Sequence, residues 1–214
     1  MTITRSLNLK PIAPFNTVPL KVTSPLPLQS RTTSMLKSFL LLGFIAFIGQ
    51  AADAPRPVVH VTNFGVVNDH LYRGAEPTAV GISELGSAGV KVLIDLRESG
   101  PGTQFEKQQA EKLGIKYTNV PFPPLAAPSP AQVQLVLNMI DQNREQTVFV
   151  HCRRGKDRTG TVIACYRVQH DGWNNAKALD EAKSFGMSSL ERGMRNFILQ
   201  FTPMVSSQSV MLTH

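Results

Sequence analysis

Residues 151–160, with the sequence HCRRGKDRTG, constrain the fold of this chain more than any other segment. They directly follow the apolar run 148–150 and lead into a helix-compatible stretch, 159–170. The order is therefore strand, tight loop and helix, with the thiol of Cys152 at one end of the loop and the guanidinium of Arg158 at the other. Such a loop turns backbone N–H groups inward at the positive end of a helix dipole. This arrangement is suited to binding a phosphate group.

The side chains of this loop predict chemistry as well as binding. Arg158 can donate two parallel hydrogen bonds to the oxygens of a phosphate. The same positive field favours the thiolate form of Cys152, which is then a nucleophile placed below the phosphorus atom. Loop amides would stabilise the phosphoryl oxygens. We expect no metal ion and no cofactor. The alternative, a buried cysteine before an ordinary helix, does not explain the surrounding pattern.

Strands alternate with helices along the rest of the chain. Apolar runs predict strands at 58–67, 71–73, 91–96, 115–120 and 147–150, and helical periodicity predicts helices at 78–85, 104–113, 131–143, 159–170, 174–185 and 189–201. Ser188 and Glu191 have the spacing of a capping box at the start of the last helix. This order indicates an α/β fold with a central, mostly parallel sheet flanked by helices.

The loop resembles the signature loop of cysteine-dependent protein tyrosine and dual-specificity phosphatases. The matching positions are His151, Cys152, Gly155, Arg158, Thr159 and Gly160. The segments 64–69 (FGVVND), 71–74 (LYRG) with Pro77, and 92–97 (VLIDLR) are similar to the atypical dual-specificity phosphatases of plants, fungi and bacteria. The similarity covers about residues 60–200. It implies a phosphotyrosine-phosphatase-like fold and hydrolysis through a phosphocysteine intermediate.

The resemblance and the loop chemistry together assign roles to the remaining loop residues. We expect Arg153, Arg154, Gly155, Lys156 and Thr159 to bind the substrate. Gly155 would let the backbone approach the ligand closely, and the Thr159 hydroxyl would reach the sulfur of Cys152. The alternatives are a solvated basic face for the loop cations and a plain helix-start role for Thr159. His151 is expected to fix the loop by hydrogen bonding rather than to act as a base.

The proton donor for the leaving alcohol is left open by the sequence. Most members of the resembled family supply an Asp from an upstream loop, but the matching segment here, 121–130, has no Asp, Glu or His. Asp157 is the leading candidate because it resembles the Asp of bacterial tyrosine and lipid phosphatases with a Gly-Lys-Asp-Arg loop. Alternatively, Asp157 only pairs with a nearby Arg or Lys. Asp95 and Glu98, at the end of the central strand, are the fallback donors, and Asp95 can instead cap a turn or orient Arg158.

The N-terminal part of the chain predicts export. Residues 1–34 are expected to be an unstructured leader, or to precede the true start at Met35. Residues 35–54 combine Lys37, the apolar run 39–49 and an Ala-rich end, which is the layout of a secretory signal peptide. An uncleaved anchor or a buried helix is the alternative. The phosphatase domain is then expected over residues 55–204, and residues 205–214 are expected to form a flexible tail. We expect a periplasmic or secreted protein that meets a membrane only through the N-terminal segment.

Charge and cysteine usage narrow the function classes. The net charge of +7 includes five Lys/Arg and one Asp in the first 54 residues, so the remainder carries a mild +3 without a basic stripe for nucleic acid. Two cysteines, Cys152 and Cys165, do not make a disulfide framework. Cys165 is expected in the core, and a protective disulfide with Cys152 is the less favoured reading because the helix carries Cys165 away from the loop.

Three functions remain. The first is a protein tyrosine or dual-specificity phosphatase acting on phosphorylated proteins. The second uses the same mechanism on inositol polyphosphates or phosphoinositides, which four cations in one loop favour. The third is a catalytically weak phosphate-binding module, which the intact Cys152 and Arg158 argue against.

Overall fold

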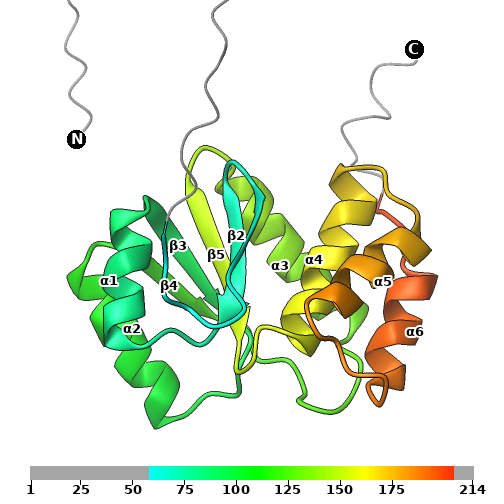
Figure 1. Cartoon of the computed structure of the whole chain (residues 1–214), viewed down its shortest axis with the longest axis horizontal. Coiled ribbons are helices and arrows are strands. Elements are labelled where there is room, and N and C mark those ends of the chain that lie inside the picture. The colour runs from blue at the N-terminus through cyan, green and yellow to red at the C-terminus, as the bar shows by residue number, and fades with distance from the viewer. Residues whose placement is uncertain (1–57, 205–214) are drawn as a thin grey trace, which may run out of the picture. The chain divides into compact units, whose positions relative to one another are not determined.

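The computed structural model describes residues 58–204, so the predicted leader, signal segment and tail lie outside the described residues. Five strands form one sheet in the order β1-β2-β5-β3-β4 (Figure 1). Their bounds are β1 Gly65–Asn68, β2 Leu71–Ala75, β3 Val90–Asp95, β4 Lys116–Asn119 and β5 Thr147–Cys152. β1 pairs with β2 in antiparallel orientation, and the other three pairings are parallel. The predicted mostly parallel sheet is confirmed.

Helices cover both faces of this sheet. Their bounds are α1 Ala79–Ser87, α2 Pro101–Lys112, α3 Pro130–Gln142, α4 Asp157–His170, α5 Asn175–Ser184 and α6 Arg192–Gln200. In Figure 1, α1 and α2 lie on one side of the sheet, and α3 to α6 lie on the other. One apolar core joins α1 and α2 to the sheet, a second joins α3 and α4 to its opposite face, and a third packs α5 and α6 on α4. The predicted α/β fold is confirmed.

Local signals explain where several helices begin. The hydroxyl of Thr78 accepts a hydrogen bond from the N–H of Gly81 at the start of α1. Ser129 and Gln132 form a capping box at the start of α3, which has Pro130 at its first position. These contacts satisfy backbone groups that have no partner within the helix.

Two sequence predictions of element bounds were wrong. The strand expected over 58–67 begins only at Gly65, because Asn63 has a positive φ of 55° and the N–H of Phe64 turns back to the carbonyl of Val61. The last helix begins at Arg192 rather than near residue 189. The expected capping box does not form, since the Ser188 hydroxyl accepts the N–H of Leu190 instead.

The parallel strands direct their carboxyl ends to one edge of the sheet. Ala75, Asp95, Asn119 and Cys152 end β2, β3, β4 and β5 in turn. In open α/β sheets, this edge is where ligands bind. Within residues 58–204, no helix has the length and apolar character needed to cross a lipid bilayer.

Candidate active site

The predicted phosphate loop connects the central strand to a long helix. Cys152 is the last residue of β5 and is 2% exposed, and α4 begins five residues later at Asp157. The first N–H groups of α4 have no acceptor within the helix, so the loop stands at the positive end of a 14-residue helix dipole. This geometry confirms the expected order of strand, loop and helix.

Gly155 allows the loop to lie against the neighbouring strand. Its φ is +66°, and a Cβ atom added there would lie 2.4 Å from the carbonyl carbon of Gly74 and 2.6 Å from the amide nitrogen of Ala75. The backbone of β2 therefore excludes a side chain at residue 155, which is a reason for glycine that the sequence did not indicate. The expected close approach of the loop backbone to a ligand stays a prediction.

An open cavity of about 640 Å³ lies beside the loop. It is lined by Glu76, Pro124, Leu125, Arg153, Arg154 and Arg158. Arg158 is fixed by a 3.2 Å hydrogen bond from its Nη1 to the carbonyl oxygen of Leu96. The structure thus brings three predicted arginines together around one cavity. Lys156, by contrast, extends along Gly186, where an added Cβ would lie 3.2 Å from its stem, and it does not line this cavity.

Glu76 is a cavity residue that sequence reasoning missed. It follows Ala75, whose Cα pairs with that of Cys152 across β2 and β5. Its carboxylate is 2.6 Å from Nη1 of Arg97. The register of two parallel strands brings Glu76 to the site, and no motif in the sequence indicates that Glu76 lies there.

The side chain of Asp157 is 8% exposed, and each of its carboxylate oxygens accepts a hydrogen bond. Its Oδ1 accepts the backbone N–H of Ser188 at 2.8 Å, and its Oδ2 accepts Nη2 of Arg154 at 3.0 Å. Asp157 therefore joins the phosphate loop to the segment before α6. The pairing with a nearby arginine, which the sequence left open, is seen in the structure, and proton donation by Asp157 stays a prediction.

A buried charge network lies behind the loop. Arg97 donates to both carboxylate oxygens of Asp95, at 2.6 to 3.0 Å, and also contacts Glu106. The hydroxyl of Tyr117 donates to Asp95 at 2.7 Å. Nε2 of His151 lies 2.8 Å from Oε1 of Glu106, close enough for an ion pair, although neither atom meets the geometry of a hydrogen bond. The network thus connects His151, the residue before Cys152, to β3, β4 and α2.

These contacts define the environment of the fallback donors. Burial raises the pKa of Asp95, but hydrogen bonds from Arg97 and Tyr117 and the nearby His151 outweigh this effect and hold the pKa below its ordinary value. Asp95 therefore stays ionised, caps the turn through the N–H of Arg97, and makes no hydrogen bond to Arg158 in the described part of the chain. Glu98 is exposed in the following loop.

Asp95, Glu106 and His151 also have the residue types of a metal site. One ligand atom from each lies within 4.8 Å of the others, and all three residues are buried. The guanidinium of Arg97 already contacts both carboxylates, so it supplies the positive charge that a metal ion would bring.

Two further predictions concern α4. The Thr159 hydroxyl is buried and makes no hydrogen bond within residues 58–204, so the bond expected to the Cys152 sulfur is not seen. Cys165 lies in the core, as predicted, and its burial raises the pKa of its thiol far above the ordinary value. Both cysteines are free thiols.

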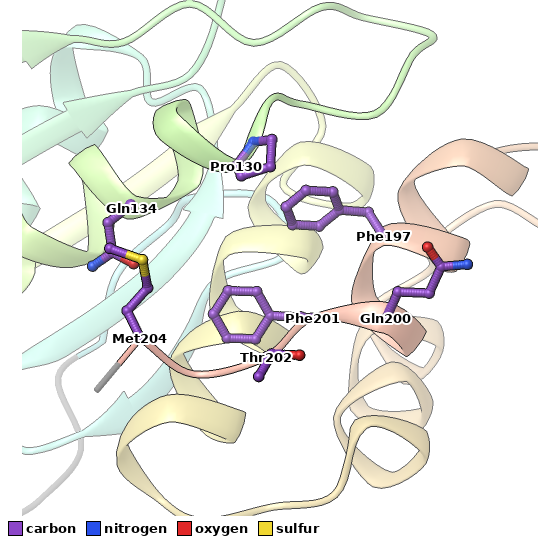
Figure 2. Close-up of a pocket in the computed structure, with 7 residues that line it drawn as sticks. All are labelled: Pro130, Gln134, Phe197, Gln200, Phe201, Thr202 and Met204. Carbon is purple, nitrogen blue, oxygen red and sulfur yellow. The ribbon is translucent and has the colours of Figure 1, made fainter. Parts of the chain in front are cut away.

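A second cavity, of about 320 Å³, lies between α3 and the end of α6. The rings of Phe197 and Phe201 line it together with Pro130, Gln134, Gln200, Thr202 and Met204 (Figure 2). None of these residues belongs to the phosphate loop, and none carries a charge. The cavity lined by arginines of the phosphate loop is therefore the candidate active site.

Comparison with known proteins agrees with this geometry. Residues 62–198 match the family described as DSP-PTPase phosphatase fused to NAD+ kinase. The chain is 30% identical over 145 residues to the probable tyrosine-protein phosphatase DG1060 of Dictyostelium discoideum, covering 65% of this chain and 85% of that one. It is 29% identical over 169 residues to the inositol diphosphatase DSP2 of rice (Oryza sativa subsp. japonica), covering 75% and 79%.

Two further proteins are similar to this chain over different shares of their own length. The phosphatidylglycerophosphate phosphatase PTPMT2 of Arabidopsis thaliana is 29% identical over 124 residues, which are 55% of this chain and only 53% of that protein. The catalytic domain of the PP-IP phosphatase SIW14 of S. cerevisiae, solved with citrate, superposes with a TM-score of 0.59 at 25% identity, over 68% of this chain and 89% of that one. The chain therefore belongs to the DSP-PTPase family of atypical dual-specificity phosphatases and is a phosphatase of the protein-tyrosine-phosphatase type.

Proposed function

We propose that the chain hydrolyses phosphate monoesters through a phosphocysteine intermediate on Cys152. The observation that carries this proposal is the placement of Cys152 at the end of β5 and of Arg158 in the first turn of α4, on either side of one short loop. The thiolate attacks phosphorus, an S–P bond forms, and the P–O bond to the leaving alcohol breaks. Water then attacks the phosphocysteine, which releases inorganic phosphate and restores the thiolate.

The loop would stabilise the charge that develops in both steps. Its backbone N–H groups and the guanidinium of Arg158 meet the equatorial oxygens of the phosphoryl group. Because Arg158 is already held by the carbonyl of Leu96, little reorganisation is needed when the substrate arrives.

We further propose that Asp157 gives its proton to the leaving alkoxide. One carboxylate oxygen is bound by Arg154, which also lines the cavity. A substrate phosphate that attracts Arg154 frees this oxygen to face the leaving alcohol.

The proposed substrate is a phosphorylated protein, with phosphotyrosine as the first residue to test. The name of the Dictyostelium relative supports this choice. A second candidate is an inositol polyphosphate, because three arginines around one cavity can bind several phosphate groups at once. The names of the rice relative and of SIW14 support that candidate.

The test is hydrolysis of para-nitrophenyl phosphate by the full chain, with and without a chelator, beside Cys152→Ser. Activity that survives the chelator and disappears in Cys152→Ser supports the thiol mechanism. Initial rates on phosphotyrosine peptides and on inositol polyphosphates then separate the two substrate classes. A folded protein that binds phosphate without turnover would instead indicate a phosphate-binding module.

We also propose that residues 35–54 export the chain to the periplasm or the cell exterior. The support is the sequence layout of Lys37, an apolar run and an Ala-rich end. N-terminal sequencing of the protein recovered outside the cytoplasm of expressing bacteria tests this proposal. A start near residue 55 supports it, and a protein found only in the cytoplasm with residues 35–54 intact contradicts it.

A further inference from the structure

Arg73 is a buried cation behind the phosphate loop. It lies in β2, and only 1% of the residue is exposed. Its Nη2 donates a 2.9 Å hydrogen bond to the carbonyl oxygen of Gly155, and its guanidinium carbon lies 3.9 Å from the centroid of the Phe185 ring. Within residues 58–204, Nε and Nη1 of Arg73 make no hydrogen bond. The guanidinium is therefore aimed at the loop and only partly satisfied there.

No carboxylate neutralises this charge within ion-pair distance in the described part of the chain. Glu181 of α5 is the carboxylate that acts most strongly on Arg73, but Arg167 of α4 holds it with hydrogen bonds of 2.8 and 3.2 Å. Burial lowers the pKa of Arg73 to about 10, and Glu181 and Cys152 counteract this effect. Arg73 is thus still charged at neutral pH, and a buried cation of this kind is costly unless an anion lies near it.

The strand register and the electrostatic influence of Cys152 on Arg73 indicate a candidate for that anion. β2 and β5 are parallel neighbours, with the Cα of Arg73 opposite Val150 and that of Ala75 opposite Cys152. Side chains two residues apart on a strand share a face of the sheet. Arg73 and Cys152 therefore lie on the same face of the sheet, on adjacent strands and displaced by two residues along them. The thiol of Cys152 is the group that can carry a negative charge there.

We propose that Arg73 is a positioning residue that stabilises the Cys152 thiolate from below and holds the carbonyl of Gly155 away from the phosphate. With this carbonyl fixed toward β2, the amides of the loop are left to face the substrate. The inference rests on the thiolate mechanism proposed above. It adds a cation outside the signature motif that sets how much thiolate the enzyme contains.

Asn63 provides a neutral control at the same atom. Its Nδ2 also donates to the carbonyl of Gly155, at 2.9 Å, and to that of Phe185, at 3.0 Å. Its φ of 55° suits glycine, so Asn63→Gly removes this donor without backbone strain. Comparison of Asn63 and Arg73 variants therefore separates the charge on Arg73 from the support that both residues give to the loop.

The experiment measures the rate of Cys152 alkylation by iodoacetamide against pH in the full chain, with Cys152→Ser as the blank for Cys165. We expect Arg73→Gln to raise the midpoint of this profile by about one pH unit. Asn63→Gly should leave the midpoint in place. Arg73→Lys keeps the charge, so its midpoint should stay near that of the wild type while kcat on para-nitrophenyl phosphate falls.

Several outcomes would overturn the inference. An unchanged midpoint in folded Arg73→Gln, or equal shifts in Arg73→Gln and Asn63→Gly, would show that the charge of Arg73 does not act on the thiol. If Arg73→Gln does not fold, a full one-unit shift in Arg73→Lys would overturn it. Turnover retained by Cys152→Ser would instead refute the thiol mechanism itself, so the two failures are distinguishable.

Discussion

Gly155 and Gly172 offer a matched test of how closely the phosphate loop packs against β2. Both have a φ of +66°. An added Cβ at Gly155 would lie 2.4 Å from the carbonyl carbon of Gly74, whereas at Gly172, after the end of α4, nothing lies within 4 Å. Alanine at either position meets the same backbone cost, but only at Gly155 does it also collide with β2.

The magnitudes follow from this difference. An L-residue in the left-handed region costs about 1–2 kcal/mol, which is the whole loss of unfolding free energy expected for Gly172→Ala. Overpacking against a rigid backbone adds about 1–3 kcal/mol, so Gly155→Ala should lose about 2–5 kcal/mol. Because β2 cannot yield easily, the loop would move by a sizeable fraction of an ångström. A displacement of about 1 Å costs roughly 100-fold in rate, and kcat should fall by this order.

Urea unfolding of both variants gives the stability difference, and turnover of para-nitrophenyl phosphate gives the kinetic one. Gly172→Ala should keep the wild-type kcat. Equal stability losses in the two variants, together with full activity of Gly155→Ala, would refute the close approach of the loop to β2.

Three other predictions follow from the site. Cys152→Ser should abolish turnover while retaining affinity for phosphate, measured by calorimetry. If this variant still turned over at the wild-type rate, the covalent mechanism would be excluded. Asp157→Asn should slow hydrolysis of alkyl phosphates by about 100-fold or more but aryl phosphates with good leaving groups much less, and equal losses would place the acid elsewhere. The lowered pKa of Asp95 means that the folded protein binds fewer protons than the unfolded chain below the ordinary value of 3.8. The stability that this carboxylate confers is therefore complete above about pH 5 and lost as the pH falls through the lowered pKa. Asp95→Asn should flatten the acid limb of a plot of unfolding free energy against pH, and an unchanged slope would contradict the assignment.

The strand, loop and helix around Cys152 could be predicted from the sequence because all their signals are local. An apolar strand, a glycine in the loop and a helix-compatible stretch lie within about twenty-five residues. The alternation of strands and helices was likewise enough to predict a mostly parallel sheet. The errors arose where one residue redirects the chain, as Asn63 does before β1 and Ser188 does before α6.

The partners of the loop were decided only by the tertiary structure. Glu76 and Glu106 lie in no motif, and the segment 71–74 that contains Arg73 does not indicate its contact with the loop. Each of the three reaches the site because a parallel neighbour or a covering helix brings it there. Sequence spacing does not encode the register between β2 and β5, which lie about 75 residues apart. Packing of the whole sheet sets that register. The nucleophile and its loop are thus local properties of this chain, whereas the charges that surround them are properties of the fold.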